Sequence, residues 1–141
     1  MVPEPPVQIG PVQIGPAQIG IAVVEHRGRY LVGTRPEGGP LGGCAEFPGG
    51  KCRSGETSGL CARRECQEET GLEVQAVDLL MHRAFTYPHG TFELHFWLCH
   101  PASRAEVADH HKGFRWVPAA ELRSLKFPEA NQPLIDVLAP K

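Results

Sequence analysis

The chain has 141 residues, a net charge of −2 and a hydrophobic fraction of 41%, a composition typical of one soluble globular domain. No apolar run approaches the length of a membrane-spanning helix and no signal peptide is visible, so we expect neither a membrane protein nor a secreted one. The lack of a basic excess argues against binding to a nucleic-acid polymer. Five cysteines without the spacing of zinc ligands indicate reduced thiols and a cytoplasmic protein.

Residues 6–20 form a threefold pentapeptide repeat, PVQIG-PVQIG-PAQIG. Three units of five residues are too short for a solenoid, and the regular prolines would interrupt a central strand. We therefore expect residues 1–17 to be an N-terminal extension, flexible or lying at a sheet edge, and residues 18–141 to form a single domain. A binding motif is the alternative interpretation of the repeat.

A hairpin is expected at the start of the domain, with strands at 18–25 and 30–34 joined by a turn at Arg27-Gly28-Arg29. A loop rich in glycine and proline follows at 36–43. Surface loops of this composition often border binding sites.

The next stretch, residues 46–74, reads EFPGGKCRSGETSGLCARRECQEETGLEV and predicts a polar loop followed by a helix. The helix-compatible run extends from about Thr57 to Thr70. Gly71 is suited to end it, because glycine readily adopts the left-handed conformation found just after helices.

Three glutamates of this helix, Glu65, Glu68 and Glu69, would fall within an arc of roughly 100° on one face. Like charges at these spacings repel one another, and clustered carboxylates suit a hard divalent cation, which prefers oxygen ligands. Glu56 at the helix entrance adds a fourth acid. For three glutamates alone, an ordinary acidic, solvent-facing helix is the alternative.

The rest of the chain alternates between extended and helical patterns, with partial alternation and many aromatics in the second extended segment. Strands, helix, strands and helix in this order predict the α/β class. The expected strands are 72–85, 92–100 and 114–117, and the expected helical segments are 119–125 and 131–138.

The loop and helix of residues 46–72 resemble the Nudix box, the signature of the Nudix hydrolases, which cleave nucleoside diphosphates linked to another group. The resemblance covers roughly 18–138. Cys66 departs from it, because the family usually has a larger aliphatic there, but a cysteine buries well as a small hydrophobe. The fixed positions of the box are all present at the family's spacing: Gly50, Glu56, Arg64, Glu65, Glu68, Glu69 and Gly71.

The resemblance implies the Nudix fold, an α/β/α sandwich with a mixed β-sheet that carries the catalytic loop-helix motif. It also implies an enzyme that acts on phosphoric anhydrides with Mg²⁺, or alternatively Mn²⁺, as cofactor. Such cations neutralise the charge of a pyrophosphate and lower the pKa of a bound water. The expected partner is a small-molecule nucleotide, and Nudix domains occur as monomers and as homodimers.

By resemblance, the metals are held by Glu65, Glu68 and Glu69 with the carbonyl of Gly49. The catalytic residues would be Glu65, Arg64 and Glu68. Glu65 is the first candidate for activating water, because Arg64 beside it can hold the carboxylates in place. Family members differ in which glutamate acts as the base.

Three further positions of the box, Gly50, Glu56 and Gly71, are expected to be structural. Glu56 is expected to pair with Arg64. A peripheral role in metal binding is the alternative for Glu56.

Substrate choice must come from outside the box, and the segment FPEANQPLIDVL, residues 127–138, is similar to that of the MutT-type (8-oxo-dGTP diphosphatase) subfamily. In that subfamily the asparagine reads the purine through its amide, and Asn131 occupies its place. A carboxamide suits a purine edge because it carries a donor and an acceptor together. A plain helix N-cap is the alternative for Asn131.

Two other substrate-binding candidates follow from the same resemblance. Phe47, in the lead-in to the box, would offer backbone groups to the base, and Arg35, at the end of a strand, would contact the nucleotide. Phe85 and Tyr87 are candidates for flanking the base, with buried core as the default for both.

One departure concerns a further glutamate that MutT-type enzymes carry in the loop before the last strand, where it helps to bind metal or position water. Asp109 or Glu106 is a candidate to replace it here, as is His110 or His111, although histidine is a less natural magnesium ligand. A solvated polar loop is the alternative.

The leading functional hypothesis is a magnesium-dependent pyrophosphohydrolase that converts an oxidised purine nucleoside triphosphate, 8-oxo-dGTP, to its monophosphate and pyrophosphate. Such an enzyme would sanitise the nucleotide pool and so serve DNA repair. The alternatives are hydrolysis of ADP-ribose, a dinucleoside polyphosphate or another nucleotide derivative, or a non-catalytic nucleotide-binding module. Loss of box glutamates would mark such a module, and none is lost.

Overall fold

The structure is a computed structural model that describes residues 15–140. The expected extension, residues 1–17, lies outside the described residues except for its end. The last copy of the repeat, PAQIG at residues 16–20, lies within the first strand, β1 (Ala17–His26), except for its proline. Each of the five cysteines is free, as the composition predicts.

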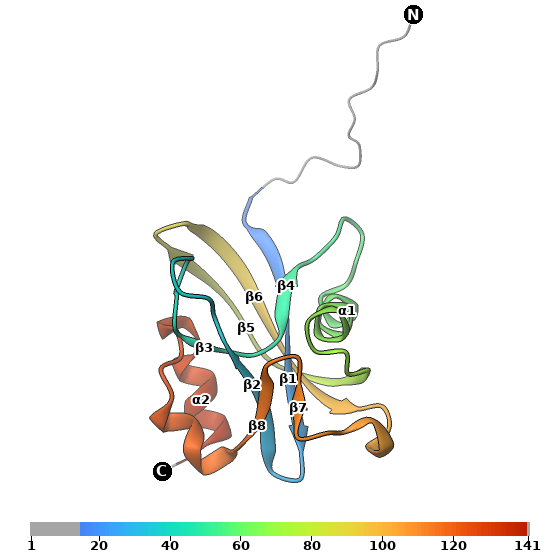
Figure 1. Ribbon diagram of the computed structural model, residues 1–141. Helices are drawn as coiled ribbons and strands as arrows, with labels where there is room; N and C mark the ends of the chain where they lie inside the picture. The colour runs from blue at the N-terminus through green and yellow to red at the C-terminus, as the bar shows by residue number, and fades with distance from the viewer. Residues whose placement is uncertain (1–14, 141) are drawn as a thin grey trace, which may run out of the picture.

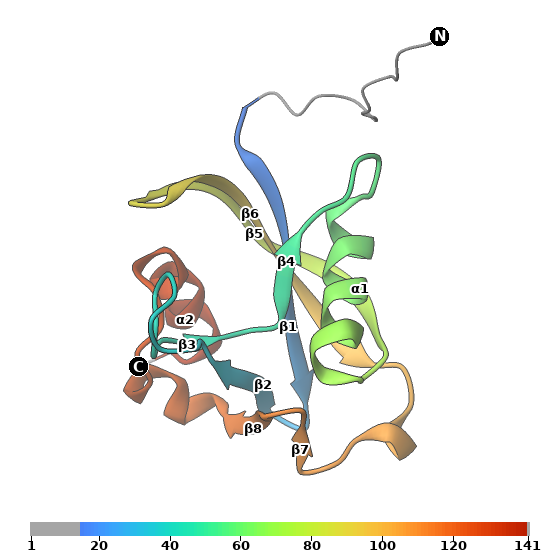
Figure 2. The same cartoon turned by 45° about the horizontal axis from the view of Figure 1, so that its top comes forward.

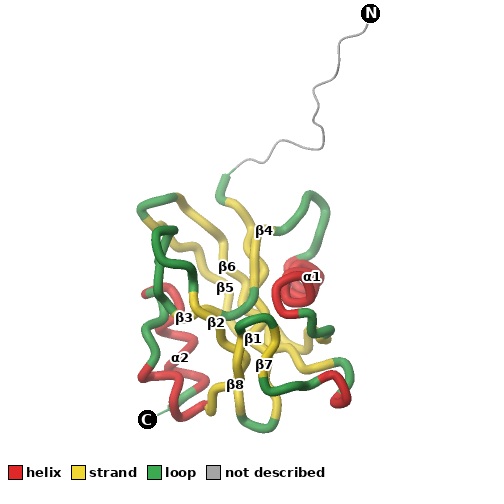
Figure 3. The backbone as a smooth tube through the Cα atoms, in the orientation of Figure 1, coloured by secondary structure: helices red, strands yellow, loops and turns green. Residues whose placement is uncertain are grey.

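A mixed sheet organises the fold, with strand order β5-β6-β1-β2-β8-β7 (Figures 1 and 3). The central strand β1 runs parallel to β6 and antiparallel to β2, and short strands β3 and β4 pair with β2 and β1. The remaining strands are β2 (Arg29–Thr34), β3 (Ala45–Glu46), β4 (Gly49–Lys51), β5 (Val74–Tyr87), β6 (Gly90–Pro101), β7 (His110–His111) and β8 (Phe114–Pro118).

Helices cover both faces of this sheet (Figure 2). On one face lies α1 (Ser58–Thr70) and on the other α2 (Gln132–Leu138) with the short 3₁₀ helices η2 (Ala119–Ser124) and η3 (Glu129–Asn131). A third 3₁₀ helix, η1 (Arg104–Glu106), lies in the connection before β7. This is the expected α/β/α arrangement.

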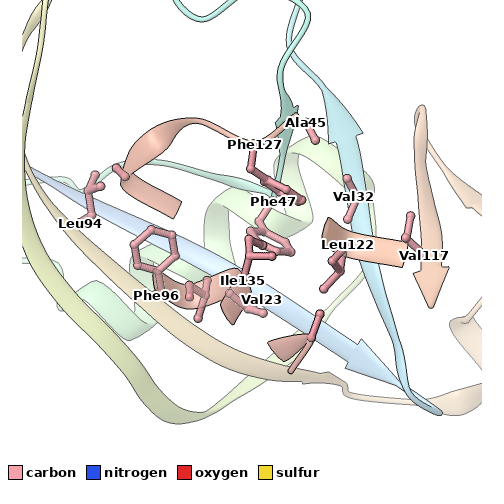
Figure 4. Close-up of a cluster of buried hydrophobic side chains, with 13 residues drawn as sticks. Val23, Val32, Ala45, Phe47, Leu94, Phe96, Val117, Leu122, Phe127 and Ile135 are labelled. Carbon is pink, nitrogen blue, oxygen red and sulfur yellow. The ribbon is translucent and has the colours of Figure 1, made fainter. Parts of the chain in front are cut away.

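Two cores result from the alternation of side chains along β1. Val23 faces the α2 side, where it meets Phe96 and Ile135 (Figure 4), and Ala22 and Val24 face the α1 side. Successive strand residues point to opposite faces, so a stretch of strand that is covered on both sides is apolar, as residues 19–24 of β1 are.

The β1–β2 hairpin forms as predicted. Its turn places Arg27 at φ 53° and Gly28 at φ 78°. Positive φ at two central residues is the geometry that matches the twist of a two-residue hairpin, and glycine adopts it without steric cost.

Helix α1 begins and ends where the sequence predicts. The Thr57 hydroxyl caps it by accepting the Leu60 N–H, and Gly71 ends it with φ 78° and an N–H bonded to the Gln67 carbonyl. Gly20 of β1 lets the helix pack closely, because a Cβ there would lie 2.7–2.8 Å from backbone atoms of α1.

The structure differs from the sequence-based expectations in two respects. The sequence patterns did not indicate β3, β4 and β7, which are two or three residues long and form through pairing with longer strands. The last helix begins at Gln132, and although Asn131 precedes it, the Asn131 side chain makes no capping hydrogen bond.

Among the described residues, none of the helices combines the length and apolar character needed to cross a membrane.

Candidate active site

A cavity of about 590 Å³ opens on the α2 side of the sheet and reaches the C-terminal part of α1. Six parts of the chain line it: β1, the loop after β2, the β3–β4 segment, the C-terminal part of α1, the tip of the β5–β6 hairpin and the segment before α2. Of the residues predicted for the site, the cavity is lined by Arg35, Phe47, Gly49, Gly50, Glu69, Tyr87 and Asn131.

Arg64 is the centre of the charge network on α1. It donates two hydrogen bonds to the carboxylate of Glu56, at 2.8 and 2.9 Å, and further bonds to Glu65 at 3.0 Å and Glu68 at 3.3 Å. It also donates to the Lys51 carbonyl of the loop at 3.1 Å. The expected Glu56–Arg64 pair is therefore present, and it joins the loop to the helix.

The pairing with Arg64 lowers the pKa of Glu56 from 4.5 to about 2. A carboxylate that accepts a bidentate guanidinium is stabilised in its charged form. Only 14% of the Glu56 side chain is exposed, so water screens the pair weakly.

Glu65 lies against Gly50. A Cβ at Gly50 would come within 2.4–2.6 Å of the Glu65 carboxylate, a separation that real side chains do not reach. Gly50 is therefore needed for its lack of a side chain, which lets the carboxylate lie on the loop backbone. This contact gives the glycine of the box its structural role.

Glu69 is the member of the glutamate trio that lines the cavity. It accepts the Gly49 N–H at 3.3 Å. The pKa of Glu69 is raised to about 7, chiefly by partial burial; the Gly49 N–H opposes the shift, and the neighbouring carboxylates of Glu65 and Glu46 add to it. A partly buried carboxylate beside other carboxylates is an environment that a cation stabilises.

The carboxylates of Glu65, Glu68 and Glu69 are of the type that binds a hard divalent cation, but they are not gathered around one point. Within residues 15–140, no three His, Cys, Asp or Glu side chains lie close enough together to hold a metal in this arrangement. The reason lies in Arg64, which pairs with Glu65 and Glu68, while Glu69 bonds to Gly49. The donors are all oxygen atoms, the type that Mg²⁺ binds, and the partly buried Glu69 carboxylate has like charges nearby that Mg²⁺ would neutralise.

Asn131 lies in the wall of the cavity. It is only 8% exposed and lines the cavity, and no hydrogen bond joins its carboxamide to another described residue. A buried amide without a partner costs free energy, so its donor and acceptor are available to a ligand.

Phe47 and Arg35 lie on the same side of the cavity. The Phe47 ring is buried and stacks on Phe127 with ring centroids 5.0 Å apart (Figure 4). Arg35 is held by the Glu46 carboxylate at 3.3 Å and the Pro40 carbonyl at 2.9 Å.

Aromatic rings at the tip of the β5–β6 hairpin also line the cavity. The Tyr87 ring stacks on His89 at 5.0 Å and 17°, with Phe92 beside both. Phe85 does not line the cavity and instead packs against Tyr87. The sequence signals missed His89, Phe92 and Glu46, although His89 stands in a Pro-His-Gly turn of the kind that often borders sites.

The loop before β8 does not supply a further acid to the cavity. Asp109, Glu106 and His110 are exposed, and none of them lines it. His111 is buried, accepts the Ala108 N–H at 3.1 Å and meets the edge of Trp116, and burial lowers its pKa. These contacts favour a structural role for His111.

Comparison with known proteins identifies the family of this chain. The family model of the NUDIX domain matches residues 20–137. The chain belongs to the Nudix family. Over 113 residues, 77% of this chain and 79% of the relative, this Nudix hydrolase is 33% identical to the 8-oxo-dGTP diphosphatase of Haemophilus influenzae.

Two further similarities bear on substrate and fold. The chain is 25% identical over 115 residues to the CTP pyrophosphohydrolase of Escherichia coli, covering 82% of this chain and 85% of the relative. The crystal structure of a MutT protein from Methanosarcina mazei superposes with a TM-score of 0.72 at 17% identity, covering 91% and 96% of the two chains. The latter similarity establishes the Nudix fold.

Proposed function

We propose that this Nudix hydrolase converts an oxidised purine deoxynucleoside triphosphate, 8-oxo-dGTP, into its monophosphate and pyrophosphate with Mg²⁺ as cofactor. The observation that carries the proposal is the buried, unbonded carboxamide of Asn131 in a cavity that also reaches Glu69 of the Nudix box. The activity of the Haemophilus relative supports the choice of substrate.

In the proposed reaction, water attacks the β-phosphorus of the triphosphate. The bond from that phosphorus to the oxygen bridging to the α-phosphorus breaks, and monophosphate and pyrophosphate leave. Glu65 accepts the proton of the water. Arg64 holds one Glu65 oxygen at 3.0 Å, and Gly50 lets the carboxylate lie against the loop, so the base is fixed before substrate binds.

Mg²⁺ supplies charge neutralisation of the pyrophosphate and a lowered pKa of water when it is bound. Glu65, Glu68 and Glu69 with the Gly49 carbonyl would hold it. Glu56 stays with Arg64, because its carboxylate is fully engaged by the guanidinium and the Arg53 N–H.

The base would lie between the aromatic rings of the hairpin tip and the Phe47 segment. Asn131 would donate and accept one hydrogen bond each along the base edge. Arg35, already held by Glu46 and Pro40, would contact the nucleotide at the mouth of the cavity. All of these residues come from one chain, so a monomer suffices to form the site. The activity would protect the cytoplasmic nucleotide pool before DNA synthesis.

A second candidate, hydrolysis of CTP, is favoured by the similarity to the E. coli CTP pyrophosphohydrolase. An asparagine carboxamide can pair with the edge of cytosine as well as with a purine, since both present donors beside acceptors. The same glutamates would carry the chemistry.

The test is pyrophosphate release in the presence of Mg²⁺ with 8-oxo-dGTP, dGTP, CTP and ADP-ribose, using wild type and Glu65→Gln. The proposal requires the highest kcat/KM on 8-oxo-dGTP and a loss of about 10²–10⁴-fold in Glu65→Gln, the range for a lost acid–base group. Preference for CTP or ADP-ribose would overturn the substrate assignment, and full activity of Glu65→Gln would overturn its role as base. A matched control is Glu73→Gln, an exposed residue outside the cavity, which should keep wild-type activity.

A further inference from the structure

Arg83 connects the edge strand β5 to the segment that carries Asn131. Its guanidinium donates a hydrogen bond of 3.2 Å to the Ala130 carbonyl, across 47 residues of sequence. Arg83 does not line the cavity. Any influence on the substrate must therefore pass through another residue.

The bonded carbonyl belongs to the peptide unit between Ala130 and Asn131. The N–H of the same unit is bonded to the Pro128 carbonyl at 2.9 Å. The peptide plane is thus held at both ends, locally by the 3₁₀ turn and remotely by Arg83. Because a peptide is planar, fixing its C=O and N–H fixes the direction of the N–Cα bond of Asn131. With the φ of −87° that Asn131 adopts, this bond sets where the side chain leaves the backbone.

Arg83 is itself held in place. Its guanidinium lies over the Phe85 ring, 5.1 Å from the centroid. A cation over an aromatic face is attracted to it, and the planar guanidinium can stack and donate at the same time. Ala130 is fully buried, so its carbonyl is shielded from water. The hydrogen bond from Arg83 therefore supplies a partner that solvent does not.

We propose that Arg83 is a positioning residue for base recognition, which orients the Asn131 carboxamide through the Ala130–Asn131 peptide. The proposal rests on the function proposed above for Asn131 and adds a residue outside the cavity that determines base selectivity. The metal-binding side of the site lies on α1, which Arg83 does not touch by any hydrogen bond in residues 15–140.

The test is a steady-state comparison of 8-oxo-dGTP and CTP with Arg83→Met, Arg83→Lys, Asn131→Ala and the double variant Arg83→Met/Asn131→Ala. We expect Arg83→Met to raise KM for the preferred nucleotide about tenfold, the effect of losing one hydrogen bond, with kcat nearly unchanged. Arg83→Lys, which keeps a cationic donor, should restore most of the affinity. In the Asn131→Ala background the loss of Arg83 should have no further effect on selectivity.

The matched control is Arg123→Met. Arg123 also bonds the C-terminal segment, through the Ala139 carbonyl and Asp136, but away from the cavity. The Arg123→Met variant should have a lower melting temperature, but the ratio of kcat/KM for 8-oxo-dGTP to kcat/KM for CTP should stay unchanged. If Arg83→Met does not fold, Arg83→Lys and Arg83→Gln carry the same comparison, with graded loss of selectivity expected.

Equal losses of kcat/KM on both nucleotides, or additive effects of Arg83→Met and Asn131→Ala on selectivity, would overturn the positioning role. A wild type that prefers CTP would refute the 8-oxo-dGTP assignment alone. In that case the single and double variants are compared with CTP as substrate. Non-additive effects would still support the positioning role of Arg83, and additive effects would refute it.

Discussion

The Glu56–Arg64 pair should make part of the stability of the fold depend on acidic pH. Replacing Glu56 with Gln removes the carboxylate while keeping its size. In the wild type the pKa of Glu56 falls from 4.5 when unfolded to about 2 when folded. A depressed pKa means that the stabilisation is fully present above pH 4.5 and is lost as the pH falls towards 2.

The size of this contribution follows from the shift. At roughly 1.4 kcal/mol per pKa unit, the shift corresponds to about 3 kcal/mol at neutral pH. The assay is urea unfolding between pH 2 and 7. Relative to wild type, Glu56→Gln should be less stable by about 2–3 kcal/mol at neutral pH, and the gap should close towards pH 2.

The control is Glu73→Gln, which replaces an exposed glutamate in the connection between α1 and β5. It should track the wild type at every pH. If the free energies of unfolding of wild type and Glu56→Gln run parallel across pH 2–5, the reasoning is refuted. Parallel curves would show that the bidentate pair with Arg64 does not lower the pKa of Glu56.

Three further predictions concern the box and its packing. Gly50→Ala should lower kcat/KM by about a hundredfold or more, because its Cβ would displace the Glu65 carboxylate; a melting curve close to that of wild type would assign the loss to the site. Gly20→Ala should destabilise the fold by about 1–3 kcal/mol in urea unfolding, because its Cβ would lie within 2.8 Å of Ser58 and Ala62 backbone atoms; unchanged stability would contradict the close packing of α1. Removal of divalent cations with EDTA should abolish pyrophosphate release, and added Mg²⁺ should restore it; persistent turnover in EDTA would argue against the carboxylate-held cation.

Much of the fold could be predicted because its signals are local. The ends of α1 follow from Thr57 and Gly71, whose capping depends on residues within one turn. The β1–β2 hairpin follows from Arg27-Gly28 for the same reason.

The features that were missed depend on contacts between distant residues. Gly49-Gly50 has little strand propensity, and β4 exists because it pairs with Ile21 and Gly20 of β1. Asn131 stands at a helix start, yet its side chain does not cap, since its backbone is already helical and the N–H bonds close the 3₁₀ turn instead.

The site shows the same contrast between what the sequence indicates and what depends on contacts between distant residues. The resemblance to the Nudix box implies the Glu56–Arg64 pair, which the structure contains. No local pattern could indicate that the hairpin tip at His89 and Phe92 lines the same cavity as Asn131, or that Arg83 reaches the Ala130 carbonyl. Those contacts depend on how β5, β6 and the C-terminal segment pack.

The measurement that tests the central claim most directly is calorimetric binding of 8-oxo-dGMP and CMP, with Mg²⁺, to wild type and Asn131→Ala. If Asn131 reads the base, wild type should bind 8-oxo-dGMP more tightly than CMP, and Asn131→Ala should lose about 10–100-fold in affinity for 8-oxo-dGMP, the cost of one to two hydrogen bonds. Affinity for CMP should change much less. An Asn131→Ala variant that binds 8-oxo-dGMP as tightly as wild type would contradict the account.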